Sequence, residues 1–94
     1  MTPNWTPRAL RDVADVTERI RAEDTQASKR MLDRVLLIAT QTLPAQPMIG
    51  RPGRVAETRE FVVHASYILV YRVKGDRLDI LAFRHTARLW PDQF

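Results

Sequence analysis

The segment at residues 44–54 most restricts what this chain can fold into, because it holds three of the six prolines and two of the three glycines. Neither a helix nor a strand is expected to continue through it, since proline lacks a backbone donor and glycine favours turns. Before it, apolar residues recur every three or four positions, and after it β-branched and aromatic residues cluster in runs. We therefore expect a helical first half, a surface loop and a sheet-forming second half.

Two amphipathic helices are expected before the loop. Thr6 can cap the first helix and Pro7 suits its first position. Asp24 or Thr25 can cap the second, which should stop at Pro44. The two apolar stripes predict a helical hairpin over a shared core. They consist of Leu10, Val13, Ala14, Thr17 and Ile20 in the first helix and of Met31, Leu32, Val35, Leu36, Ile38, Ala39 and Leu43 in the second.

Strand signals follow the loop at residues 59–63, 67–73 and 78–84, and Gly75-Asp76 supports a hairpin between the last two. The alternation of polar and apolar residues is absent at 68–70 and imperfect at 78–83, as in central strands covered on both faces. Residues 2–5 can add a short first strand that Pro3 limits to an edge or an end. The predicted class is α+β, in the order β-α-α-β-β-β, with a two-helix antiparallel hairpin on a mainly antiparallel sheet.

Composition sets further bounds. Ninety-four residues suffice for about one domain, taken as residues 1–94. Thirteen of the fifteen basic residues are Arg, against eleven Asp and Glu, which favours a negatively charged partner. The absence of Cys excludes disulfides, thiolate zinc sites and a cysteine nucleophile. Neither a signal-peptide pattern nor an apolar run of about 20 residues is present, so a cytoplasmic protein without a metal or cofactor is expected.

Five blocks of the sequence, in their order and spacing, resemble the RelE/ParE superfamily, the toxins of bacterial type II toxin–antitoxin pairs. The match is best to members described as ParE-like or plasmid-stabilisation toxins, and it covers nearly the whole chain. The blocks are Trp5-Thr-Pro-Arg-Ala-Leu-Arg-Asp-Val13, Gly50-Arg-Pro-Gly-Arg-Val55, Thr58-Arg-Glu-Phe-Val-Val63, Tyr67-Ile-Leu-Val-Tyr-Arg-Val73 and His85-Thr-Ala-Arg-Leu-Trp-Pro91.

The resemblance implies a small basic toxin and an acidic antitoxin encoded beside it, whose C-terminal amphipathic segment docks on the helical hairpin and the sheet edge. Leu10, Val13 and Trp90 are the expected antitoxin contacts. Two activities occur in the superfamily. RelE-like members cut messenger RNA in the ribosomal A site, whereas ParE-like members poison DNA gyrase.

The cations that RelE-like nucleases use are only partly kept in this sequence. Ile68 stands where such nucleases place an Arg, and Phe61 replaces the second basic position of the preceding strand. Phe94 stands where some members carry a tyrosine, so it cannot transfer a proton. Arg59 and Arg88 do match nuclease positions. The resemblance thus favours a gyrase inhibitor over an enzyme, with the messenger RNA endonuclease and a non-toxic antitoxin-binding module as alternatives.

Four residues are the expected target contacts: Arg59, Arg84, Arg88 and Trp90. Arg59, His85 and Arg88 are the candidates for catalysis if the chain is a nuclease. Arg59, His85, Arg88 and Trp90 each have a structural alternative. Arg59 could pair with Glu57 or Glu60, and Trp90 could fold back to close the core.

Overall fold

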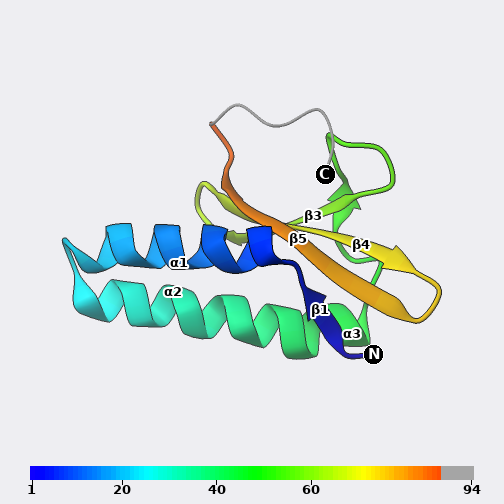
Figure 1. Ribbon diagram of the computed structural model, residues 1–94, viewed down its shortest axis with the longest axis horizontal. Coiled ribbons are helices and arrows are strands. Elements are labelled where there is room, and N and C mark those ends of the chain that lie inside the picture. The colour runs from blue at the N-terminus through cyan, green and yellow to red at the C-terminus, as the bar shows by residue number, and fades with distance from the viewer. Residues whose placement is uncertain (88–94) are drawn as a thin grey trace.

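The computed structural model describes residues 1–87 and confirms the α+β order expected from the sequence (Figure 1). A helical hairpin packs on one face of a five-stranded sheet whose strand order is β1-β5-β4-β3-β2. No helix within these residues is long and apolar enough to cross a bilayer. The elements are β1 (Pro3–Trp5), α1 (Pro7–Arg21), α2 (Thr25–Leu37), the π-helical turn η1 (Ile38–Thr42), α3 (Leu43–Ala45), β2 (Arg51–Pro52), β3 (Arg59–His64), β4 (Tyr67–Lys74) and β5 (Arg77–His85).

Helix α1 starts where local chemistry predicts. The Thr6 hydroxyl accepts a hydrogen bond from the Ala9 backbone N–H at 3.2 Å, and Pro7 occupies the first turn, where no donor is needed. The Thr6 hydroxyl and backbone N–H both donate to the Ile80 carbonyl, at 2.9 and 3.1 Å. Thr6 therefore fixes the start of α1 against β5.

The buried face of α1 differs from the predicted stripe. Leu10 is 55% exposed and Ala14 is also exposed, whereas Ala9 and Val16 are buried beside Val13. Both stripes have helical spacing, and the anchoring of Thr6 on β5 decides which of them faces the sheet. The same correction applies to α2, where Leu32 and Leu36 of the predicted stripe are 38% and 44% exposed.

The second helical run extends one residue beyond its predicted stop at Pro44, to Ala45. A proline inside a helix normally clashes with the carbonyl four residues back. Here the preceding turn is the wider π-helix η1, in which the Leu43 N–H donates to the Ile38 carbonyl. The wider turn accommodates Pro44 without that clash. The helical run therefore continues to Ala45, and Leu43 is fully buried in the core.

The predicted loop at 44–54 also contains the two-residue strand β2, which pairs antiparallel with β3. Pro52 is compatible with a strand there because β2 is the sheet edge and needs no donor on its outer side. At the opposite edge, β1 pairs parallel with β5 and begins at Pro3. The rest of the sheet is antiparallel, and Gly75, with φ +59°, makes the turn between β4 and β5.

The two central strands bury side chains on both faces, as the sequence predicted. Leu69 and Tyr71 of β4 belong to the main core beneath the helices, and Ile68 and Val70 belong to a second cluster. Because side chains alternate along a strand, the second cluster lies on the opposite face. The imperfect alternation in β5 has a physical cause: the register places Val70 opposite Ala82 but Tyr71 opposite Ile80, so Leu81 is an extra, bulged residue.

Candidate functional site

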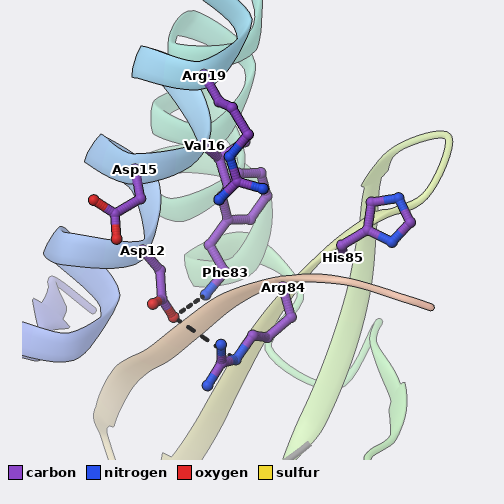
Figure 2. Close-up of a pocket in the computed structure, with 7 residues that line it drawn as sticks. All are labelled: Asp12, Asp15, Val16, Arg19, Phe83, Arg84 and His85. Atoms are coloured by element: carbon purple, nitrogen blue, oxygen red, sulfur yellow. Dashed lines mark hydrogen bonds and ion pairs between the residues drawn. The ribbon is translucent and has the colours of Figure 1, made fainter. Parts of the chain in front are cut away.

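A small cavity lies between α1 and the C-terminal end of β5, and two of the candidate residues, Arg84 and His85, contribute to its lining (Figure 2). Its volume is about 80 Å³. Small-molecule sites typically enclose roughly 300–1,000 Å³, so this cavity suits a water or a partner's side chain rather than a substrate. It is lined by Asp12, Asp15, Val16, Arg19, Phe83, Arg84 and His85.

Asp12 is the central polar group of this cavity. Its Oδ2 accepts the Phe83 backbone N–H at 3.1 Å and lies 4.0 Å from the Arg84 Nε (Figure 2). The Asp12 carboxylate therefore provides an acceptor for the Phe83 N–H of β5, at a position that the short strand β1 does not reach. Burial raises the pKa of Asp12 above its usual value, and the Phe83 hydrogen bond and the nearby Arg8 offset this only in part.

Replacing Asp12 by a neutral side chain is expected to increase the free energy of unfolding most at neutral pH. A carboxyl with a raised pKa in the folded state contributes stability below its ordinary value, and that contribution is lost as pH rises through the raised pKa. Asp12→Asn should thus gain stability relative to the unmodified chain between pH 3.5 and pH 7, as measured by urea unfolding. A relative loss over that interval would mean that the neighbouring arginines outweigh burial.

Arg59 has neither of the two predicted partners. Its Nη1 donates to the carbonyls of Met48, at 3.3 Å, and Gly50, at 2.7 Å. The salt bridge predicted with Glu57 or Glu60 is replaced, and Glu60 pairs instead with Arg51 at 3.2 Å. Arg59 fastens the loop before β2 to the sheet.

The structure does not bring Arg59 and Arg84 together. On β4, Arg59 pairs with Tyr71 and Arg84 pairs with Ile68. Paired residues share a face of the sheet. Since Tyr71 belongs to the helix-side core and Ile68 to the opposite cluster, the two arginines lie on opposite faces, about 10 Å apart along the strand direction. They cannot act together on one phosphate.

His85 has structural contacts. Its ring makes an edge contact with Tyr67 at a centroid distance of 5.2 Å, and its Nδ1 accepts the Ala87 backbone N–H at 3.1 Å. Figure 2 shows the ring turned away from Asp12. Across residues 1–87, no group of three or more His, Asp or Glu side chains is placed to hold a metal ion.

The two positions where a nuclease would carry cations are part of the core. Ile68 is fully buried in the second apolar cluster, and Phe61 packs against the main core. The expected antitoxin contacts differ in accessibility: Leu10 is 55% exposed, whereas Val13 is 7% exposed and is a core residue. Arg88, Trp90 and Phe94 lie outside the described residues.

A second recess, at the far end of the hairpin, was missed by the sequence analysis. It lies between the end of α1, the outer part of α2 and the end of β3, and its volume is about 200 Å³. The sequence feature that could have indicated this recess is the pair Arg30 and Arg34, two like charges four residues apart on one face of a helix. The recess is lined by Ile20, Ala27, Arg30, Met31, Arg34 and His64.

Comparisons with known proteins agree with this fold. The family model described as "ParE toxin of type II toxin-antitoxin system, parDE" matches residues 4–90. Protein Y4kP of Sinorhizobium fredii, named as a toxin, is 38% identical over 88 residues, which is 93% of this chain and 90% of that protein. Toxin RelE2 of Caulobacter vibrioides is 36% identical over 85 residues, covering 90% of this chain and 94% of its own length.

Two solved structures have the same architecture. A chain of the chromosomal ParDE system from P. aeruginosa aligns with a TM-score of 0.69 at 21% identity, over 90% of this chain and 95% of that one. A chain of the RelBE2 toxin–antitoxin complex from Mycobacterium tuberculosis aligns with a TM-score of 0.63 at 26% identity, over 89% and 95%. With the family model matching almost the full length, the chain belongs to the ParE toxin family of type II toxin–antitoxin systems.

Proposed function

We propose that this toxin inhibits DNA gyrase and is not itself an enzyme. It would act in the cytoplasm as a single domain spanning residues 1–94, and an acidic antitoxin encoded beside it would neutralise it. The observation that carries the proposal is Ile68, which is 0% exposed where the resemblance to nucleases calls for an Arg. A buried aliphatic side chain can neither hold a phosphate nor stabilise the charge that develops during RNA cleavage.

Two further observations support the proposal. Arg59 donates through Nη1 to two backbone carbonyls, and Arg84 lies on the other face of the sheet, so these cations do not converge. The Nδ1 of His85 accepts a backbone N–H, which ties the ring to the local turn instead of directing this nitrogen at a substrate. Cleavage at a 2′-hydroxyl needs a base and cations around one point.

The test is a supercoiling assay with purified gyrase and relaxed plasmid. The toxin is expected to block supercoiling and to leave linear, protein-linked DNA, and the antitoxin should relieve both effects. Arg88→Ala should weaken inhibition at least fivefold if Arg88 is an interface anchor, in keeping with the usual 1 kcal/mol or more for such residues. Arg11→Ala removes a charge from the exposed side of α1 and serves as the matched control, with an expected change below twofold.

A parallel assay on purified ribosomes separates the alternatives. Cut messenger RNA, with gyrase unaffected by folded toxin in high excess, would refute the proposal and favour an endonuclease, which the similarity to the toxin named RelE2 keeps in consideration. If neither target is affected while the antitoxin still binds, the chain is a non-toxic antitoxin-binding module.

A further inference from the structure

The stretch 50–55 contains two Gly-Arg pairs, and both of its glycines lie too close to a neighbour to carry a side chain. A Cβ on Gly50 would lie 2.6 Å from the Tyr71 hydroxyl oxygen, and a Cβ on Gly53 would clash with the Thr58 Oγ1. The Gly53 N–H also donates to the Thr58 carbonyl at 2.8 Å. The backbone of this stretch is therefore fixed against the sheet, and both of its arginine side chains start from defined positions.

A buried carboxylate, that of Glu60, joins this stretch to β3. Glu60 is 3% exposed. Its Oε1 accepts from the Arg51 Nη2 at 3.2 Å, and its Oε2 accepts the Arg54 backbone N–H at 2.9 Å. Glu60 pairs with Val70 in the register of β3 and β4, so its side chain lies with the second apolar cluster on the face opposite the helices. The backbone of Arg54 is therefore held on that face.

The Arg54 side chain reaches from the β3 side of the sheet to the end of β5. Its Nη2 donates to the Thr86 carbonyl at 3.1 Å, and β4 lies between the two strands that this contact joins. The Thr86 N–H donates to the Ser66 carbonyl at 2.7 Å, and the N–H that follows it donates to the His85 Nδ1 at 3.1 Å. These hydrogen bonds fix the chain where it leaves β5, just before Arg88.

The contact from Arg54 differs in kind from the other two. Ser66 and His85 lie at the ends of β4 and β5, so their contacts extend a hairpin that already joins these strands. Arg54 is 32 residues from Thr86 in the sequence and reaches it from the face opposite the helices. The Arg54 contact therefore draws the end of β5 toward that face.

We infer that Arg54 is a positioning residue for gyrase inhibition: it fixes the place and the face of the sheet from which the chain continues to Arg88 and Trp90. The inference rests on the proposed function, in which these two residues contact the target. A segment whose start is held in one orientation loses less conformational entropy when it binds. The Arg54 guanidinium is engaged with a backbone carbonyl, so its role is to orient the segment and not to touch gyrase.

The first arm of the test follows tryptic cleavage after Arg88, detected by mass spectrometry as loss of the C-terminal peptide. Arg54→Gln keeps the backbone N–H that binds Glu60 and removes the side-chain cation. It should speed this cleavage about fivefold, as expected when local opening no longer breaks a charged hydrogen bond. Arg54→Lys keeps a cationic donor and should restore part of the protection. Arg51→Gln is the matched control, because the Arg51 side chain ends on Glu60, and it should change the rate by less than about twofold.

The second arm is the supercoiling assay with the same variants, each shown to be folded by urea unfolding. Arg54→Gln should raise the toxin concentration for half-inhibition about fivefold, and Arg51→Gln should leave it within about twofold.

The two arms separate this inference from the proposed function. Unchanged cleavage in Arg54→Gln would overturn the inference while the proposed function stands. Faster cleavage with undiminished inhibition would also overturn it, because the chain end would then play no part in inhibition. If Arg51→Gln speeds cleavage as much as Arg54→Gln, the loop is loosened in general and the inference is wrong. A toxin that is cleaved as expected but never inhibits gyrase refutes the proposed function and, with it, the role of Arg54 in inhibition.

Discussion

Replacing Asp79 by alanine is expected to lower the free energy of unfolding by about 3 kcal/mol, near the lower end of the effects seen when a buried ion pair loses one partner. Asp79 is only 4% exposed. Its Oδ1 accepts from the Asn4 side chain at 3.1 Å, and its Oδ2 accepts from the Arg77 Nε at 3.2 Å and lies 3.9 Å from the Arg72 Nη2. One carboxylate thus joins β1, β4 and β5.

The lower end of the range is expected because Arg72 and Arg77 are 28% and 59% exposed and can reach water once the carboxylate is gone. Urea unfolding gives the total effect, and hydrogen exchange at Trp5 should report a specific loosening of β1. Asp76→Ala, in the adjacent turn, is the matched control and should change stability by less than about 0.5 kcal/mol. A loss below 1 kcal/mol for Asp79→Ala would show that the three partners find equivalent contacts without it.

The parts of the fold that depend on short-range chemistry could be predicted from the sequence. Thr6 and Asp24 cap their helices through side-chain oxygens three residues from the amides they bind, at 3.2 and 3.0 Å. Gly75 supplies the positive φ of a tight turn. Such signals lie within a few residues, so they are visible before any tertiary contact is known.

The faces of the helices and the partners of the charged side chains could not be predicted in the same way. Periodicity admits either Leu10 or Ala9 on the inner side of α1, and the Thr6–Ile80 contact, 74 residues apart, decides between them. The carbonyls that Arg59 binds belong to a loop about ten residues away, placed by β2 and β3. For the same reason the Asp12–Phe83 contact has no sequence signature.

These contacts also change which charged residues are candidates for a functional role. Arg59 and His85 were candidates for chemistry because of their types and positions, and both have structural contacts within the chain. Arg30 belonged to no expected site, yet it stands on an apolar recess without an acidic neighbour in the lining. In a chain with an excess of arginine, the charges without an internal role are the better guide to partners.

Replacing Tyr71 by phenylalanine is expected to cost about 2–3 kcal/mol of folding free energy, because one hydroxyl serves two backbone groups, one buried and one partly buried. It donates to the Pro47 carbonyl at 2.8 Å and accepts the Gly50 N–H at 2.9 Å. The Tyr71 ring is fully buried, and a Cβ on Gly50 would lie 2.6 Å from its oxygen, so water has little room to replace the hydroxyl. The loop that carries the exposed Met48 and Ile49 should lose its fixed conformation.

The dependence of this effect on pH provides a second measurement. Burial raises the pKa of Tyr71 above its usual value of 10.0. The stability that the neutral hydroxyl provides is therefore present below that value and is lost as pH rises through the raised pKa. The difference in unfolding free energy between the unmodified chain and Tyr71→Phe should stay constant from pH 7 to 9 and shrink at higher pH.

Tyr67→Phe is the matched control, because Tyr67 stacks on Phe83 through its ring at a centroid distance of 5.5 Å and the substitution keeps that ring. It should change stability by less than about 0.5 kcal/mol. An equal loss of stability in the two phenylalanine variants would mean that the hydroxyl of Tyr71 does not hold the loop.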